Sequence, residues 1–425
     1  MLTNEQMIQD LAGVCRFESV AHADPANTEA PYGLEVHKAL LYMLDLCSRF
    51  GFRTKNCDNR IGYAEIGEGE EMIGILAHLD VVPAGDGWIV PAYDATEVDG
   101  RIYGRGVCDD KGPAVACVYA MKDLLDQGVK LNRRIRIIFG QTEENGDWTD
   151  MEYYAENEEL PTFGFTPDGN FPAIYGEKGI LHVLIHMNKN ESGLLKAQAG
   201  QAINVVPDEA SATVIRDGKE VTYTASGKSA HGSTPEEGDN AIAHLMQDMA
   251  ADGIDAGFVR FFNDCIGFDV NGGKSGAGFS DEQSGLLTLN AGVLTATDDE
   301  VTQTIDIRHP VTVTAEEVLQ GLHKAMDPYG VTLEVLSVQK PVYSDKKGEL
   351  ITKLVSVYRE MTGDMTEPMV IGGGTYAKAM DHIVVFGPMI PGREMTEHQR
   401  NEYMLREDYV LLREIYRKAL EKLAV

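Results

Sequence analysis

Metal-ligand side chains follow four apolar segments of this chain, at or beyond the point where each segment ends. They are His78 and Asp80 after residues 73–77, Glu143 and Glu144 after 135–140, Asp168 after 163–167, and His398 beyond 383–387. Short apolar runs that end in polar residues indicate buried parallel strands. Open α/β sheets bind ligands at the carboxyl ends of such strands. Two histidines and several carboxylates at one edge therefore predict a metal site.

The spacing within these segments suggests separate tasks for neighbouring side chains. On an extended backbone residues i and i+2 point the same way, so Asp80 can orient the His78 imidazole through its second nitrogen. Adjacent residues point to different sides, so one of Glu143 and Glu144 can bind metal while the other moves protons. Each pair alone has an ordinary alternative, a chance His-x-Asp or a solvated acidic surface. Their joint placement at strand ends favours the site.

A glycine-rich segment, residues 104–113, contains two adjacent aspartates and ends in Pro113. Glycine lets the backbone pass close to a site, and proline suits the first turn of a helix. An acidic turn at a helix start can supply a metal ligand, although an ordinary solvated turn is an equal alternative. Nucleotide binding is not indicated, because neither phosphate-cradling glycine motif is present.

The elements that must position these residues fall into two patterns. Helix patterns at residues 34–50 and 112–127 alternate with the strand patterns at 73–77 and 135–140, which predicts an α/β domain with a mostly parallel sheet. From residue 180 alternating strands at 180–187, 221–225, 286–291 and 301–307, with a helix near 239–252, predict an antiparallel sheet with helices on one face. We expect a catalytic domain in two parts, residues 1–180 and 338–425, and an inserted α+β lid domain, residues 181–337.

Composition excludes several classes of partner. Of 425 residues, 37 are Lys or Arg and 67 are Asp or Glu, giving a net charge of −30. Nucleic acid and anionic membrane surfaces would be repelled. The six cysteines lack zinc-type spacing, and neither a signal-peptide pattern nor an apolar stretch of membrane-spanning length is found. We expect a cytoplasmic protein without membrane partners.

Taken together, these segments resemble the di-zinc metallopeptidase family that includes aminoacylase, carnosinase and carboxypeptidase G, in particular the bacterial PepV-type dipeptidases. The resemblance runs through nearly the whole chain. It rests on His78-Leu-Asp80, Gly104-Arg-Gly-x-x-Asp109-Asp-Lys-Gly112, Glu143-Glu144, Pro167-Asp168, Ile203-Asn204, His231-Gly-Ser-Thr-Pro235, Asp306-Ile-Arg308, Gly372-Gly-Gly-Thr-Tyr-Ala377 and His398-x-x-Asn401-Glu402. It implies a catalytic domain of the zinc-peptidase type.

The resemblance also implies a ligand set. One metal would be held by His78, Asp109 and Asp168, and the second by Asp109, Glu144 and His398, with Asp109 bridging. Family members commonly have a cis peptide bond after the bridging aspartate. The ions would be Zn²⁺, with Mn²⁺ or Co²⁺ as alternatives that suit the same donors.

The remaining roles follow from the same resemblance. Glu143 would be the general base and Asp80 the partner of His78. In the lid domain His231 would stabilise the oxyanion, and the substrate carboxylate would be held by Asn204, Arg308, Gly373 and Gly374.

The predicted function is hydrolysis of the amide bond of dipeptides, or similar short substrates with a free carboxyl terminus, by a water held between the two metals. A small peptide would be the partner, and the protein a monomer or homodimer. One alternative is an N-acyl amino acid amidohydrolase such as an aminoacylase or desuccinylase, which shares every ligand. An alternative from another class is a catalytically inactive peptide-binding protein.

Overall fold

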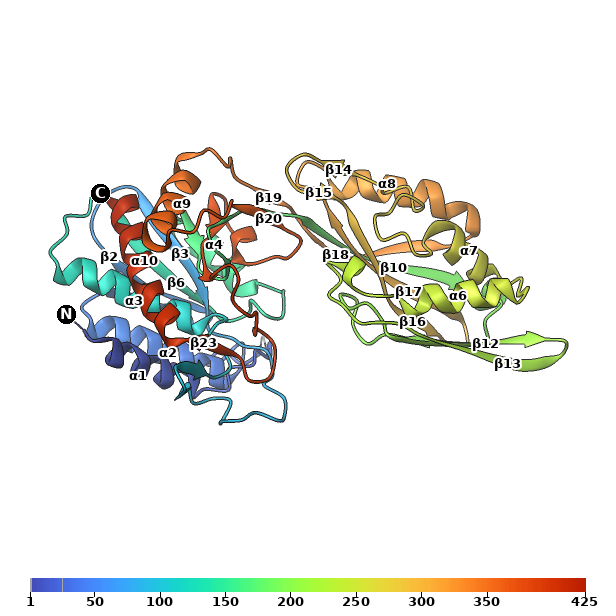
Figure 1. Cartoon of the computed structure of the whole chain (residues 1–425), viewed down its shortest axis with the longest axis horizontal. Coiled ribbons are helices and arrows are strands. Elements are labelled where there is room, and N and C mark those ends of the chain that lie inside the picture. The colour runs from blue at the N-terminus through green and yellow to red at the C-terminus, as the bar shows by residue number, and fades with distance from the viewer. Residues whose placement is uncertain (1, 25) are drawn as a thin grey trace. The chain divides into compact units, whose positions relative to one another are not determined.

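The computed structural model describes residues 2–24 and 26–425. The chain forms two compact units. Unit 1 contains the residues up to Tyr175 together with Ser344–Met369 and Thr375–Val425, and unit 2 contains Gly176–Tyr343 and Val370–Gly374. Figure 1 shows the elements of each unit. The predicted domain boundaries at residues 180 and 337 stay a prediction.

Unit 1 combines helices with a mixed sheet. Its helices are α1 (Asn4–Cys15), α2 (Leu34–Arg49), α3 (Lys111–Asp126), α4 (Thr149–Asn157), α9 (Glu349–Thr362), the short η3 (Tyr376–Lys378) and α10 (Arg406–Ala424). Its strands are β1 (Arg53–Cys57), β2 (Ile61–Ile66), β3 (Met72–His78), β4 (Thr96–Val98), β5 (Arg101–Tyr103), β6 (Arg134–Gly140), β7 (Phe163–Thr166), β8 (Gly169–Asn170), β21 (Ile383–Val385), β22 (Pro388–Met389) and β23 (Tyr403–Leu405). Strands β9 (Ile174–Glu177) and β20 (Met369–Ile371) cross the division between the units.

The main sheet of unit 1 has the strand order β1-β2-β6-β3-β7-β21 and continues into β9. Strand β3 pairs in parallel with β6 and β7, and β21 pairs in parallel with β7. The predicted α/β fold with a parallel sheet is therefore confirmed, with the parallel strands at its centre. Its edge is antiparallel, because β1 and β2 form a hairpin whose turn has positive φ at Asp58 and Asn59. This hairpin was not predicted from the sequence.

Parallel pairing aligns the strand ends that carry the candidate ligands. His78 at the end of β3 lies opposite Gly140 at the end of β6, and Val385 lies opposite Thr166 at the end of β7. All seven residues of β3 are buried, as expected for a strand covered on both faces. The polar residues that follow these strands therefore emerge at one edge of the sheet.

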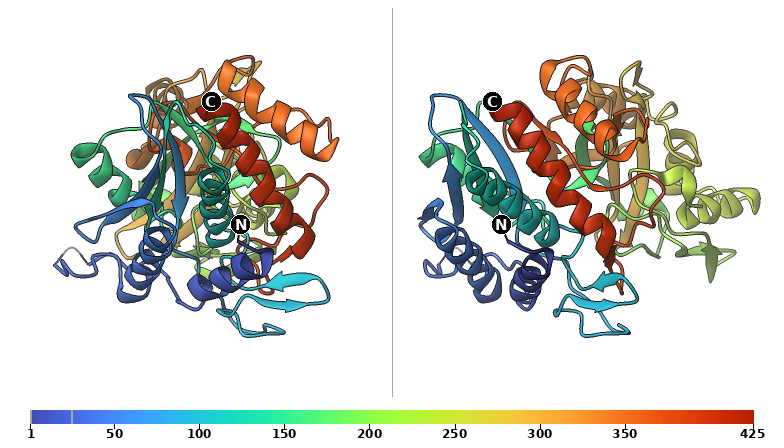
Figure 2. Two further views of the ribbon diagram at one scale, coloured as in Figure 1. Left: turned by 90° about the vertical axis from the view of Figure 1, so that its left-hand side faces the viewer. Right: turned by 60° about the vertical axis from the view of Figure 1, so that its left-hand side comes forward.

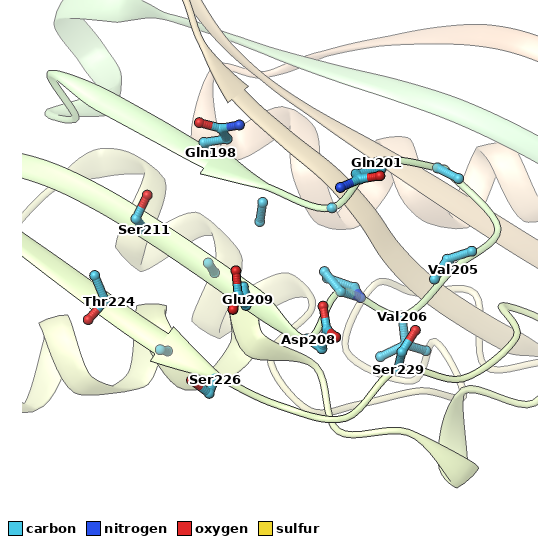
Figure 3. Close-up of a pocket in the computed structure, with 16 residues that line it drawn as sticks. Gln198, Gln201, Val205, Val206, Asp208, Glu209, Ser211, Thr224, Ser226 and Ser229 are labelled. Atoms are coloured by element: carbon cyan, nitrogen blue, oxygen red, sulfur yellow. The ribbon is translucent and has the colours of Figure 1, made fainter. Parts of the chain in front are cut away.

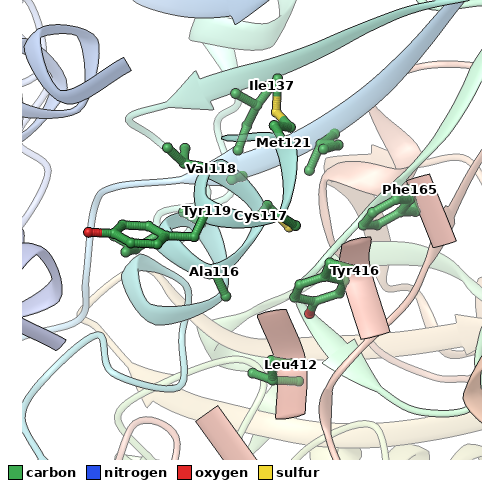
Figure 4. Packing of buried hydrophobic residues seen from close by; sticks show 14 of the residues in the cluster. Ala116, Cys117, Val118, Tyr119, Met121, Ile137, Phe165, Leu412 and Tyr416 are labelled. Atoms are coloured by element: carbon green, nitrogen blue, oxygen red, sulfur yellow. The ribbon is translucent and has the colours of Figure 1, made fainter. Parts of the chain in front are cut away.

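The core of unit 1 holds this edge in place. Helices α3 and α10 lie side by side on the sheet (Figure 2). Between them pack fully buried side chains, including Cys117, Leu412 and Tyr416 (Figure 4). The Tyr416 ring stacks on Phe165 of β7, with ring centroids 5.8 Å apart. Packing of α10 thus fixes the helix that begins beside Asp109 and the strand that ends before Asp168.

We expect Leu412→Ala to lower the free energy of unfolding of unit 1 by about 2–5 kcal/mol, because it removes buried methyl groups and leaves a cavity. Urea denaturation of the wild type and the variant measures this loss. Leu160, which is 48% exposed, is the matched control, and its change to alanine should cost about 0.5 kcal/mol or less. Equal losses for both variants would contradict the assignment of Leu412 to the core.

Unit 2 is an antiparallel sheet with helices. Its strands are β10 (Gly179–Asn188), β11 (Lys196–Ala199), β12 (Glu209–Arg216), β13 (Lys219–Ser226), β14 (Ser280–Asp281), β15 (Gly285–Leu286), β16 (Thr288–Ala296), β17 (Glu300–His309), β18 (Thr332–Gln339) and β19 (Val342–Tyr343). Its helices are α5 (Lys189–Ser192), η1 (Pro235–Glu237), α6 (Ala241–Ala251), α7 (Gly257–Cys265), α8 (Ala315–Met326) and η2 (Asp327–Tyr329).

Seven strands of unit 2 form one sheet in the order β13-β12-β11-β16-β17-β10-β18. All the recorded pairings in it are antiparallel. A separate core joins α6, α7 and α8 to the buried face of this sheet. The predicted α+β architecture is confirmed. The strand expected at residues 286–291 begins instead at Thr288 and runs to Ala296, because Leu286 belongs to the short hairpin of β14 and β15.

Within the described residues, the helices are all too short or too polar to cross a membrane.

Candidate metal centre

The predicted ligands of unit 1 come from five separate parts of the chain. His78 ends β3, and the Glu143-Glu144 pair follows β6. Asp168 follows β7, Asp109 lies two residues before the start of α3, and His398 lies in the loop before β23. The structure brings all of them together at the carboxyl edge of the parallel strands, as the distances below show.

His78 is buried and is held from both ring nitrogens. Its Nε2 lies 2.8 Å from Asp109 Oδ1 and 3.8 Å from Asp168 Oδ2. Its Nδ1 lies 3.0 Å from the main-chain oxygen of Asp80 and 3.4 Å from the Asp80 carboxylate. Its main-chain N–H donates to Asp110 Oδ2 at 3.2 Å. Nε2 is therefore the ring nitrogen that faces the other candidate ligands.

His398 completes the other side of the group. Its Nε2 lies 2.9 Å from Asp109 Oδ2 and 3.0 Å from Glu144 Oε2. The two oxygens of Asp109 thus face two different histidines, which is the placement expected of a bridging carboxylate. The peptide bond between Asp109 and Asp110 is cis.

The charges of this group are unbalanced. Desolvation and the negative charge of Asp109 raise the pKa of Glu144, and the same two causes raise the pKa of Asp168 to about 8. Desolvation, together with the charge of Asp168, raises the pKa of Glu143 well above its usual value. Hydrogen bonds to Asp109 and Glu144 raise the pKa of His398 to about 11. Several carboxylates of unit 1 are therefore close enough to repel one another, and the imidazoles of His78 and His398 lie among them as hydrogen-bond partners.

The residues present fit a pair of divalent cations. One ligand atom each of His78, Asp109 and Glu144 lie within 4.8 Å of one another, and the same holds for His78, Glu143 and Asp168. Glu144 Oε1 is buried and accepts no hydrogen bond from any of the described residues. A buried oxygen without a partner is costly, and a cation would satisfy it. Mixed carboxylate and imidazole donors suit Zn²⁺, Mn²⁺ or Co²⁺.

The carboxylate of Asp80 holds the turn that carries the two glutamates. Its Oδ1 accepts the main-chain N–H of Glu143 at 3.1 Å, and its Oδ2 accepts that of Glu144 at 3.0 Å. Asp80 also lies beside His78, as the sequence predicts. One buried side chain therefore fixes the direction of an imidazole and of two neighbouring glutamates.

The predicted substrate residues lie in unit 2. Arg308 is buried and forms two hydrogen bonds with Asp306, Nε to Oδ1 at 2.8 Å and Nη2 to Oδ2 at 3.0 Å. Its Nη1 donates to the main-chain oxygen of Gly372 at 3.0 Å. Gly373 and Gly374 follow in the bend after β20. A guanidinium has five N–H groups, so Nη1 and Nη2 each keep one beyond these bonds.

His231 lies in the same part of unit 2. Its Nδ1 accepts the main-chain N–H of Ser233 at 3.2 Å and lies 2.7 Å from the Ser233 hydroxyl. The neutral ring then carries its proton on Nε2, which is the tautomer needed to donate to an oxyanion. The main-chain oxygen of Asn204 accepts the N–H of Gly232 at 2.7 Å. Unit 2 thus brings His231 and Asn204 together, and holds Arg308 beside the glycine-rich bend.

The family model of peptidase family M20/M25/M40 matches residues 74–422 of the chain. The chain belongs to this family. The predicted family and the metallopeptidase class are confirmed. Every candidate ligand and the whole of unit 2 lie within the matched segment.

Individual relatives agree with this membership. A Staphylococcus haemolyticus protein, named provisionally as a dipeptidase, is 36% identical over 457 residues, covering 99% of this chain and 97% of the relative. The fold is similar to that of human carnosine dipeptidase 1, with a TM-score of 0.63 and 17% identity, over 99% of this chain and 96% of that one. It is also similar to a dinuclear metal-binding M20 peptidase of Bacillus subtilis, with a TM-score of 0.56, 12% identity and 99% of both chains covered.

Two further residues of the present chain, Asp150 and Tyr376, support the Glu143-Glu144 turn, and neither was predicted to do so. Asp150 Oδ2 accepts the main-chain N–H of Gln141 at 2.5 Å and the hydroxyl of Tyr376 at 2.6 Å. The Tyr376 ring in turn meets the His78 ring edge-on, with centroids 6.2 Å apart. Tyr376 lies in the segment that carried the family resemblance, whereas Asp150 has no sequence signal, because a single acidic residue near a helix start is common.

A polar cavity of ≈ 810 Å³ also lies in unit 2 of the M20 peptidase. It is lined by side chains of β11, β12 and β13, among them Gln198, Ser211 and Thr224 (Figure 3). Among the described residues that line it, none belongs to the predicted substrate set. It is therefore separate from the group formed by Arg308 and Gly372.

Proposed function

We propose that the protein hydrolyses the amide bond of dipeptides, or of similar short substrates with a free carboxyl terminus. The observation that carries the proposal is the placement of the Glu143 carboxylate beside His78 and Asp168, next to the group formed by His78, Asp109 and Glu144. A glutamate beside a candidate metal pair is placed to move protons. The names of the relatives described above favour dipeptides within the peptidase class.

The proposed ligands divide between two ions. His78, Asp109 and Asp168 would hold one ion, and Asp109, Glu144 and His398 would hold the other. When bound, divalent cations supply a Lewis acid for the carbonyl oxygen and increase the acidity of water. Asp80 keeps His78 turned toward this pair.

The other residues move protons and offset charge. Glu143 takes the proton of the attacking water and returns it to the leaving amine. The Nε2–H of His231 donates to the carbonyl oxygen as negative charge develops on it. The Ser233 N–H, which donates to Nδ1, supports this tautomer. The two remaining N–H groups of Arg308 bind the substrate carboxylate, and Asp306 holds the guanidinium in place.

We expect Arg308→Ala to weaken transition-state stabilisation for a free dipeptide by about 2–5 kcal/mol, because it removes the partner of a desolvated carboxylate. The corresponding dipeptide amide lacks that carboxylate and should lose far less. The measurement is kcat/KM of the wild type and the variant on both substrates. Equal losses on both substrates would assign Arg308 a purely structural role as the partner of Asp306.

The substrate class itself is tested with a panel of dipeptides, tripeptides and N-acyl amino acids, assayed with metal-reconstituted protein. Dipeptides should be hydrolysed fastest. A strong preference for N-acyl amino acids would instead assign the protein as an acylase, and binding of peptides without turnover would assign a binding protein.

The six cysteines are all buried and free, which supports a reducing, cytoplasmic location.

A further inference from the structure

Glu402 is a fully buried carboxylate that the proposed mechanism does not use. Its Oε1 accepts the main-chain N–H groups of Cys108 at 2.8 Å, Gly106 at 3.1 Å and Asp109 at 3.3 Å. Its Oε2 accepts Arg105 Nη1 at 2.6 Å, and Gly106 N–H lies 3.2 Å from this oxygen too. One side chain therefore accepts the main-chain N–H groups of three of the four residues from Gly106 to Asp109.

Other contacts join the same two segments. The main-chain N–H of Gly104 donates to the main-chain oxygen of Glu402 at 3.0 Å, and the Cys108 thiol donates to the main-chain oxygen of Tyr403 at 3.0 Å. Strand β5 pairs with β23, with Tyr103 opposite Tyr403. These contacts join residues 103–109 to the segment of residues 398–403, and we call the two joined segments one layer. The Glu402 carboxylate lies at its centre.

This layer carries both ends of one short contact. Asp109 Oδ2 and His398 Nε2 lie 2.9 Å apart, although the residues come from distant parts of the chain. His398 and Asn401 both have φ of 61°, a left-handed conformation that asparagine adopts readily but that is strained for a histidine and must be held by its surroundings. The Asn401 side chain accepts the N–H of Ile89 at 2.8 Å, which holds the turn from the other side.

We propose that Glu402 is a positioning residue of the metal centre. It holds the bridging ligand Asp109 and the terminal ligand His398 at a fixed distance from each other before any metal binds. This rests on the proposed function only in taking these two side chains as ligands. Residues that orient ligands through hydrogen bonds change metal affinity or activity by about 10–100-fold when they are replaced.

The competing explanation is that Glu402 is only the buried ion-pair partner of Arg105. The chain offers a matched control for it. Asp123 and Arg413 are also buried, and form two hydrogen bonds at 2.6 and 2.7 Å between α3 and α10. Asp123 contacts no candidate ligand in the described structure. Loss of this pair tests the effect of an uncompensated buried arginine alone.

The experiment compares Glu402→Gln with Asp123→Asn in the full chain, using Co²⁺ as the probe. Glutamine keeps the size of the side chain, but one carboxylate oxygen becomes a donor that faces other donors. We expect Glu402→Gln to weaken Co²⁺ binding by about 10–100-fold and to alter the visible Co²⁺ spectrum. Asp123→Asn should lower the thermal unfolding midpoint and leave both Co²⁺ readouts unchanged. Wild-type affinity and spectrum in Glu402→Gln would overturn the proposal.

A measurement on the wild type covers the case in which Glu402→Gln does not fold. If Glu402 sets the segment before metal binds, the amides of Gly106, Cys108 and Asp109 should exchange slowly with deuterium in the metal-free protein. Exchange as fast as in an exposed loop would overturn the proposal. Failure of the wild type to hydrolyse any substrate in the panel, with the Co²⁺ difference intact, would reject the proposed function and leave the role of Glu402 standing.

Discussion

Glu143→Gln is expected to lower kcat by about 10²–10⁴-fold, because the amide has the size of the carboxylate but cannot accept a proton. Metal content should stay at the wild-type level, since the proposed ligands are all retained. Steady-state kinetics and metal analysis of the same preparation measure the two effects together. This combination distinguishes a base from a ligand, which matters because the Glu143 carboxylate also lies within ligand distance of His78 and Asp168.

Glu144→Gln is the matched comparison, since it makes the same change at the next residue. It should weaken binding of one metal, because Glu144 Oε2 faces His398 and its Oε1 is buried without a hydrogen-bond partner among the described residues. Glu156→Gln, on the exposed face of α4, controls for any general effect and should be silent. Near-normal kcat in Glu143→Gln would place the base elsewhere, and loss of metal from it would make Glu143 a ligand.

Removal of metal is expected to abolish turnover, and re-addition of Zn²⁺, Mn²⁺ or Co²⁺ should restore it. The physical reason is that no residue of unit 1 described at this centre supplies a Lewis acid, while its carboxylates need opposing charge. Metal analysis of gently purified protein should find up to about two equivalents, as a two-metal hydrolase requires.

The control for chelation is the same chelator saturated with metal before addition. Circular dichroism before and after treatment shows whether the fold survives. Asp109→Asn should reduce binding of both ions, because each oxygen of Asp109 faces a different histidine. Full activity in folded, metal-free protein would refute the metal centre and with it the proposed function.

The sequence alone was enough to predict the two architectures and which side chains gather at the edge of the sheet. Apolar runs at residues 73–77 and 135–140 end in polar residues, and parallel strands align their carboxyl ends. His78 and Glu143 must then emerge close together, whatever the rest of the chain does. The β1 and β2 hairpin was not predicted, because it depends on positive φ at Asp58 and Asn59 and on pairing of β2 with β6.

Only the tertiary structure decided how the ligands are held. The Asp80 carboxylate accepts hydrogen bonds from the main-chain N–H groups of Glu143 and Glu144. The Glu402 carboxylate accepts them from the segment that ends at Asp109, and in both cases donor and acceptor are far apart in sequence. Such bonds use donors that every residue except proline possesses, so they leave no pattern of residue types to recognise. A lone acidic residue in a loop is usually solvated. Folding alone shows that these carboxylates are buried and that the backbone donors of two distant segments converge on them.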